Sequence, residues 1–336
     1  MNANWRLAGG AIALFIVIGI LLPSRVEIVR EIQIDAPPAT VFALLNDFRK
    51  VREWAPFSAD DPNARLTIGD VLSGEGATMS WSGQLIGEGR QTIVQSVPHE
   101  RIAIDVDTGD GREATSVFDL TRREAGTALS WTWQSDYGFN LFGRYFALLQ
   151  DRIRGPTMER DLARLGELAG NLPRADWGDL EIERIVVEAE DIAYITTRSL
   201  PRADAISAAM NNSFFDIYDF IDRHGLARAG APMSITRTFS GSELVFDAAI
   251  PVRGLTDDTP RTENAVKIGE TYAGTLIRVR HTGSYATLGR THDKIAAYLA
   301  ATGIERNGDA WESYVSDPGR TDASGLHTYI YYPVRN

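Results

Sequence analysis

A glutamate and a tyrosine two positions apart, Glu312 and Tyr314, are the residues whose types and spacing point most directly to ligand chemistry. In a strand, side chains alternate between the two faces of a sheet, so Glu312 and Tyr314 share one face while Trp311 and Val315 share the other. We expect the Trp311 face to pack on helices, which leaves the carboxylate and the phenol on the open face. A carboxylate among aromatic rings attracts a cation, and each aromatic wall adds about 0.5–2 kcal/mol.

Three further residues are candidates for the same site. Tyr329 and Tyr331 lie on the last expected strand, 327–332, and by the same alternation they extend the aromatic wall. Asp247 is a weaker candidate, because acidic residues often end strands and face solvent. Two other interpretations of Glu312 stay open: a solvated side chain on an edge strand without function, and a general acid or base surrounded by Trp and Tyr residues.

Several enzyme classes lack their residues. The chain has no cysteine, no G-x-S-x-G elbow, no phosphate-binding P-loop and no G-x-G-x-x-G after a strand. Its five histidines never occur at a tight metal-binding spacing. We therefore expect no cofactor and no metal, and we assign no catalytic residue apart from Glu312 should the protein be an enzyme.

The composition predicts an acidic protein with about two domains. The chain has 336 residues, of which 44% are hydrophobic and 24% charged, and a domain takes roughly 150 residues. The formal net charge of −11 divides into +2 for residues 1–25, −6 for 26–175 (16 basic, 22 acidic) and −7 for 176–336 (16 basic, 23 acidic). Neither large segment has the basic excess of a nucleic-acid binder, so we expect no nucleic-acid partner.

An apolar run near the N-terminus predicts a membrane anchor. Residues 7–22 are sixteen consecutive uncharged residues, preceded by Trp5 and Arg6 and followed by Pro23. The run is about 24 Å long, a little short of the ~30 Å hydrocarbon core, and including Trp5 and Pro23 extends it to a single transmembrane helix over 5–23. The alternative is a cleaved signal peptide, but no A-x-A-like site follows the run. The short positive tail favours the cytoplasmic side, so we expect the remaining chain outside the cytoplasm.

Residues 26–172 show the element order of a helix-grip domain. Apolar and polar residues alternate over 26–34, as in a half-buried strand, and Pro37 and Pro38 then open a short helix. Short strands separated by Gly, Pro and Asp follow between about 64 and 134. Apolar residues at helical spacing predict a long helix over 155–168.

Three stretches and the long helix carry a family resemblance. The stretches are IQIDAPP with VF (32–38, 41–42), WAPF (54–57) and GATMSW (76–81). On these residues, 26–170 resemble the START/polyketide-cyclase-like superfamily. The resemblance implies a sheet curled around the long helix, with an apolar cavity that binds lipids or polycyclic molecules in some relatives. Trp81, Trp131 and Trp133 are candidates for its lining, ordinary core packing being the alternative.

A linker at 173–179 leads to a repeated domain over 180–336. Each half begins with a strand, continues with a helix closed by glycine, and ends with two strands. The interval from Tyr194 to Leu276 and the interval from Pro251 to Pro333 are both 82 positions. Matching ends imply a duplicated β-α-β-β module whose sheet carries helices on one face.

Six stretches in this second domain carry another resemblance. They are GAPM (230–233), FDAAIPV (246–252), HTGSY (281–285), WESY (311–314), DP (317–318) and YYPV (331–334). They resemble the gyrase-inhibitor-like, or AraC-type effector-binding, family. The resemblance implies a cleft between the repeats that binds amphipathic, often cationic, small molecules, with Glu312 at the family's central acidic position. Many relatives also carry a helix-turn-helix, which this chain lacks, so a role in transcription is in doubt.

We therefore predict an α+β protein with a single transmembrane helix within 1–25, a helix-grip domain over 26–172 and a duplicated effector-binding domain over 180–336. The predicted function is a non-catalytic, membrane-anchored binder of amphipathic or lipophilic small molecules, cationic ones included, or of lipids. Two alternatives stay open: a hydrolase of reactive small molecules that uses Glu312 as general acid or base, and a structural or partner-docking protein.

Overall fold

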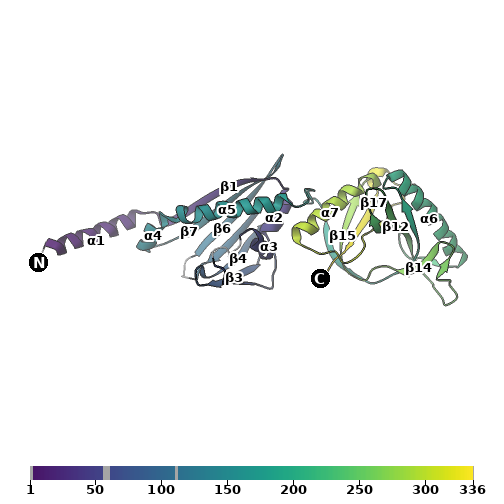
Figure 1. Ribbon diagram of the computed structural model, residues 1–336, viewed down its shortest axis with the longest axis horizontal. Helices are drawn as coiled ribbons and strands as arrows, with labels where there is room; N and C mark the ends of the chain where they lie inside the picture. The colour runs from purple at the N-terminus through teal and green to yellow at the C-terminus, as the bar shows by residue number, and fades with distance from the viewer. Residues whose placement is uncertain (1–2, 56–60, 110–112, 336) are drawn as a thin grey trace. The chain divides into compact units, whose positions relative to one another are not determined.

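The chain forms two compact units. In the computed structural model, which describes residues 3–55, 61–109 and 113–335, the first unit is Met1–Gly178 with Ala300–Thr302, and the second is Asp179–Leu299 with Gly303–Asn336. Both are α+β, and each is built on an antiparallel sheet (Figure 1).

The first unit is organised by a seven-stranded sheet with the strand order β1-β7-β6-β5-β4-β3-β2. In β1, Ile28 and Ile34 are buried while their neighbours are more exposed, as the alternation of an outer strand requires. The strands are β1 (Arg25–Ile34), β2 (Arg65–Ile68), β3 (Thr78–Gly83), β4 (Gly87–Val97), β5 (Arg101–Asp107), β6 (Glu113–Arg123) and β7 (Gly126–Asp136). Residues 110–112, between β5 and β6, lie outside the described part of the chain.

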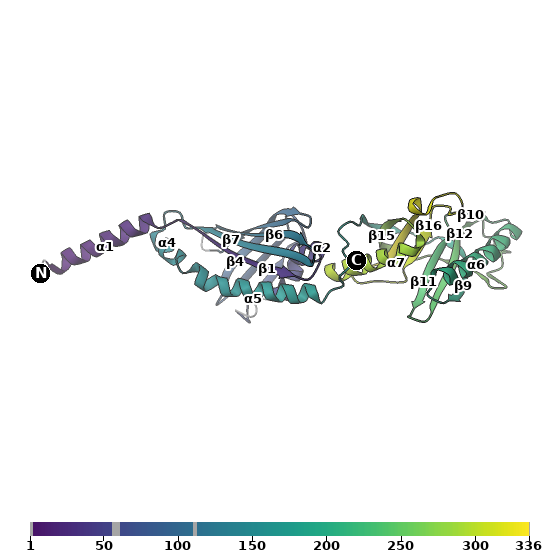
Figure 2. The same cartoon turned by 90° about the horizontal axis from the view of Figure 1, so that it is seen from above.

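A long helix, α5 (Gln150–Gly170), runs along this sheet (Figure 2). Met158, Leu162, Leu165 and Ala169 recur at a spacing of three or four and are all buried, so they form the stripe that packs on the sheet. The helix begins five residues before the predicted start at 155. Pro156 lies inside it, because a proline removes one backbone hydrogen bond but does not prevent a helix that tertiary packing supports.

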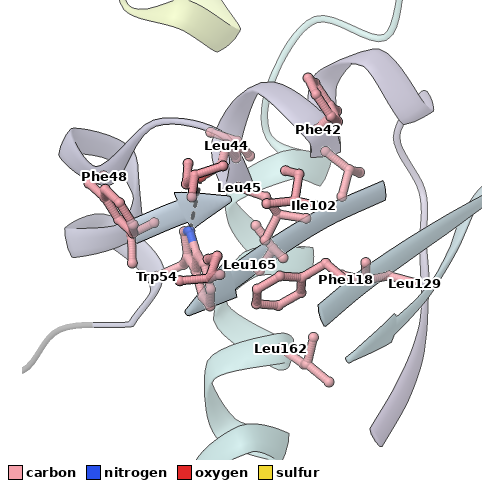
Figure 3. Packing of buried hydrophobic residues seen from close by; sticks show 14 of the residues in the cluster. Phe42, Leu44, Leu45, Phe48, Trp54, Ile102, Phe118, Leu129, Leu162 and Leu165 are labelled. Carbon is pink, nitrogen blue, oxygen red and sulfur yellow. Dashed lines mark hydrogen bonds between the residues drawn. The ribbon is translucent and has the colours of Figure 1, made fainter. Parts of the chain in front are cut away.

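Two short helices, α2 (Pro38–Leu45) and α3 (Phe48–Trp54), close one end of the core. Figure 3 shows their apolar side chains meeting those of the sheet and of α5. The Trp54 Nε1–H donates a hydrogen bond of 3.2 Å to the Leu44 carbonyl (Figure 3), and the Trp54 ring lies edge-on to Phe118. The indole nitrogen is thus satisfied inside the core, which lets the ring be buried without an unpaired donor.

The prediction of a transmembrane helix is wrong. The N-terminal helix α1 (Ala3–Leu21) has 19 residues, and none of the helices in the described part of the chain is both long and apolar enough to cross a membrane. Its uncharged run is about 24 Å long against ~30 Å of hydrocarbon, and Trp5 and Pro23 do not make up the difference. The single-pass membrane localisation, which depended on this helix, is wrong for the same reason.

A further short helix, α4 (Leu141–Ala147), contacts α1 through Tyr145, whose O–H donates a hydrogen bond of 2.7 Å to the Phe15 carbonyl.

The second unit is organised by a larger sheet with the order β13-β14-β9-β12-β11-β16-β17-β15-β8, and β10 pairs with β12. Its two repeats are β9-α6-β11-β12 and β15-α7-β16-β17, joined side by side where β11 pairs with β16. The strands are β8 (Ile182–Val187), β9 (Asp191–Ser199), β10 (Ala227–Arg228), β11 (Met233–Phe239), β12 (Leu244–Arg253), β13 (Thr262–Glu263), β14 (Val266–Glu270), β15 (Gly274–Thr282), β16 (Trp311–Tyr314) and β17 (His327–Pro333).

The helices α6 (Ala203–Arg223) and α7 (Leu288–Thr302) each build a core on their own repeat. Phe220 of α6 packs with Phe246 of β12, and Ile295 of α7 packs with Ile330 of β17. A separate apolar cluster that includes Trp311 forms from side chains of alternate strand positions. The sheet therefore has a helix-covered face and an opposite face with its own aromatic cluster.

The ring of His99 lies between the core of the first unit and Trp177, which is close to Gly178, where the main segment of that unit ends. It meets Phe42 and Trp177 edge-on, with ring centroids 5.6 and 5.7 Å away. Burial lowers the pKa of His99; the nearby Asp176 carboxylate opposes this, and Arg122 adds to it. The folded state thus binds the His99 proton less tightly than the unfolded state does.

We expect this histidine to make the first unit less stable as the pH falls from about 7.5 to about 5.5, because the unfolded state then takes up more protons. His99→Asn should flatten the dependence in that window, since asparagine does not titrate and tolerates the positive φ of 63° at this position. Thermal unfolding of the unchanged chain and of His99→Asn at a series of pH values measures the difference between their pH slopes. The other four histidines are present in both proteins, so their contributions cancel. Equal slopes for both proteins would contradict the assignment.

Candidate functional site

A cavity of about 510 Å³ lies between the sheet and α5 in the first unit. This volume is within the range of about 300–1,000 Å³ typical of small-molecule sites. Four tryptophans line it, Trp54 from α3, Trp81 from β3, and Trp131 and Trp133 from β7. The three tryptophans that were candidates from the sequence all line it, together with Trp54. Trp54, Trp81 and Trp133 also belong to the buried apolar core, which was the alternative for these residues.

The sheet side of the cavity presents mainly apolar surface. The Trp131 Nε1–H donates to the Ser116 hydroxyl at 2.7 Å, and the Trp54 Nε1–H is taken up by a backbone carbonyl. Both indole donors are therefore used within the protein, and their rings add apolar wall beside Phe118 and Ile104. Such a wall suits an apolar ligand group, whose burial contributes about 25 cal/mol per Å².

The polar side of the cavity comes from α5. The Arg154 guanidinium lies 3.7 Å from the centroid of the Trp133 ring, as in a cation–π contact. Farther along the helix, Arg164 Nη1 lies 3.3 Å from the Asp161 carboxylate, of which 12% is exposed. A second cavity of about 370 Å³ shares Trp133, Arg154 and Thr157 in its lining, so these residues stand between the two.

The second unit holds Glu312 in a chain of hydrogen bonds. One carboxylate oxygen is 2.7 Å from His292 Nε2 on α7, and the other accepts the Tyr314 O–H at 2.5 Å. On its far side, His292 Nδ1 is 2.8 Å from the Tyr332 hydroxyl. Only 19% of the Glu312 side chain is exposed. Glu312 therefore lies on the helix-covered face, whereas we expected the open face; Trp311 packs on the opposite face instead.

The two phenols of this hydrogen-bonded network, those of Tyr314 and Tyr332, remain protonated at neutral pH. Burial and the adjacent Glu312 carboxylate raise the pKa of Tyr314 well above its ordinary value, and burial raises the pKa of Tyr332 to about 12. The Tyr332 O–H can therefore donate to His292 Nδ1, and in that arrangement the Nε2–H donates to Glu312. Chemically, this arrangement holds a carboxylate in one orientation among three tyrosines, with Tyr285 edge-on to Tyr314 at 5.3 Å.

Tyr329 and Tyr331 do not surround Glu312. In the register of β16 and β17 they pair with Ser313 and Trp311, and directly opposed residues share a face. Both tyrosines therefore lie on the face opposite to Glu312. The sequence could not show this, because alternation within each strand does not reveal the register between them.

Asp247 is also on the opposite face and is already engaged. Its side chain is 3% exposed and binds Arg237, which also reaches Asp309 at 2.6 Å. Arg237 is the extra residue of a β-bulge in β11, and a bulge re-aims the side chain it carries. We assign Asp247 to this ion-pair network and not to the surroundings of Glu312.

Two functional candidates, His292 and Arg154, escaped the sequence reasoning. His292 lies four residues after Leu288 and three before Ile295, which is the spacing of one helix face, and this was the available signal. Arg154 fell one residue before the predicted helix start, so its place on the face of Thr157 and Met158 was not apparent.

The first unit is similar to a known protein family. Residues 25–170 match a protein family described as polyketide cyclase/dehydrase and lipid transport. The matched residues include the strands β1 to β7 and the helix α5, which enclose the cavity. No curated protein matches the chain.

Several solved structures are similar to parts of the chain. A protein from Chromobacterium violaceum is 17% identical and covers 43% of this chain and 96% of its own, with a TM-score of 0.34. The EcmrR C-terminal domain is 13% identical and covers 47% and 99%, with a TM-score of 0.39. A hydrolase from Listeria innocua is 15% identical and covers 46% and 91%, with a TM-score of 0.33.

Proposed function

We propose that this protein binds amphipathic or lipophilic small molecules, and that the first unit's cavity takes the apolar part of the ligand. The observation that carries the proposal is the cavity of about 510 Å³ walled by four tryptophans. A pocket of this size beside the main apolar core offers space for a ligand, and the family match supports that function.

Calorimetric titration of the full chain with dodecanol, a neutral amphiphile, tests the proposal. We expect saturable binding, with a negative heat-capacity change because apolar surface is buried. Absence of binding to dodecanol and to its charged analogues would contradict the function.

We also propose Glu312 as the anchor of a positively charged ligand group in the second unit. The observation that favours it is a carboxylate that is mostly buried and oriented by His292 and Tyr314. Aromatic rings around a carboxylate favour a cation through Coulomb attraction and cation–π contacts. The test is the affinity of a lipophilic cation, dodecyltrimethylammonium, for the chain with and without the Glu312 charge.

A further inference from the structure

The charges that line the first unit's cavity are opposite in sign to those of the chain around it. Residues 26–175 contain 16 basic and 22 acidic residues. Among the residues that the structure describes, in contrast, the charged groups lining the cavity are Arg154, Arg160 and Arg164 with one acid, Asp161. All four come from α5. A positive lining in a negative domain is not explained by overall composition.

We infer that the ligand of this cavity is an amphiphile with an anionic head group, a carboxylate or a phosphate, bound at the α5 side. The inference rests on the proposed function of the same cavity and names its ligand class. The tail lies against the tryptophan wall, and the head group lies at the arginines.

Arg154 is the best-placed partner for such a head group. Its guanidinium carbon lies over the Trp133 ring, 3.7 Å from the centroid, and the residue is partly buried and lines both cavities. A guanidinium stacked on a ring directs its N–H groups along its own plane, and this planar fork matches the oxygens of a carboxylate or a phosphate. Because the site is partly shielded from solvent, the attraction is screened less than at an open surface.

The other charged residues add to this field at the rim. Arg160 is exposed and donates 2.9 Å to the Thr157 hydroxyl, so it stays on its own helix. Asp161 offsets Arg164, its neighbour at 3.3 Å. Among the described lining residues, three positive groups thus stand against one negative group. The tryptophan wall offers a head group little competing polarity, since the Trp131 and Trp54 donors are already bonded.

Calorimetry with four dodecyl compounds tests the inference on the full chain: dodecanoate, dodecyl phosphate, dodecanol and dodecyltrimethylammonium. We expect at least one anion to bind about tenfold more tightly than dodecanol, as a charge-assisted hydrogen bond allows, and the tighter anion identifies the head group. Dodecanol binding as tightly as both anions would overturn the inference while leaving the proposed function standing. No binding by any of the four would instead overturn the proposed function itself.

Substitutions place the effect on α5. Arg154→Met keeps an unbranched apolar stem over Trp133 but removes the charge, so the anion should lose about tenfold in affinity while dodecanol changes by less than about twofold. Arg164→Gln should lower anion affinity in the same direction. Arg152→Gln is the matched control, because Arg152 is exposed on the same helix and does not line the cavity. Unchanged dodecanol binding reports that each variant is folded. Equal anion affinity in Arg154→Met and Arg152→Gln would overturn the assignment.

Discussion

Thr157→Trp is expected to lower the affinity of the first unit for dodecanol by at least about a hundredfold, because the indole displaces part of the tail and its apolar surface is then no longer buried. Thr157 lines both cavities, and its side chain is only partly buried. An indole at this position would occupy the space that the ligand needs. Isothermal titration calorimetry measures the affinity, and thermal unfolding of the same sample shows whether the fold is kept.

The matched control is Glu167→Trp, which adds the same ring to an exposed position of α5 outside the cavity lining. It should bind dodecanol as the unchanged chain does. A Thr157→Trp protein that is folded and still binds with the original affinity would show that the amphiphile lies elsewhere.

Glu312→Gln is expected to weaken binding of dodecyltrimethylammonium to the second unit by about ten- to a hundredfold, because a charge-assisted contact becomes a neutral one. Glutamine has nearly the same shape, and its side-chain oxygen can still accept one of the hydrogen bonds from His292 and Tyr314. The measurement belongs in the Thr157→Trp background, where the first cavity is filled and calorimetry reports the second unit alone.

The control for the Glu312 prediction is Glu181→Gln, which removes a negative charge from a side chain that is 79% exposed. Equal cation affinity in Glu312→Gln and Glu181→Gln would remove Glu312 from the binding account. If Glu312→Gln instead abolished hydrolysis of an electrophilic substrate while cation affinity stayed the same, the general acid or base interpretation would replace the anchor.

The repeat of the second unit could be read from the sequence because matched ends are local features. The interval of 82 positions from Pro251 to Pro333 joins β12 to β17, and the interval from Tyr194 to Leu276 joins β9 to β15. In the register, however, Pro251 pairs with Ile192 and Pro333 pairs with Leu276, so the position of β9 that corresponds to Leu276 is Ile192 and not Tyr194. Alternation along β16 likewise separated Glu312 and Tyr314 from Trp311. These patterns depend on residues close in the chain.

The surroundings of Glu312 depend on contacts that are distant in the chain. Alternation shows which residues share a face, but not which face the helices cover, and Trp311 is buried by stacking on Tyr331 at 4.9 Å without a helix. His292 reaches Glu312 from a helix 20 positions away. The side assigned to Glu312 was therefore wrong, and its partner His292 was missed.

The cavity shows the same limit. Its tryptophans were credible candidates because of their size and the strands they occupy, but Arg154 could be assigned to it only once the phase and the start of α5 were known. Packing on the sheet lets this helix begin at Gln150, on the N-terminal side of Pro156. The local sequence signals for a helix start do not include that packing energy.

The most direct test of the central claim, that the first unit's cavity holds an amphiphile, is photo-labelling of the full chain with a diazirine-bearing dodecanoate, followed by peptide mapping. The account predicts labels on α5 near Thr157 and on β7 near Trp131 and Trp133, and their loss in Thr157→Trp. Labels confined to residues 179–336, or labels unchanged in Thr157→Trp, would contradict it.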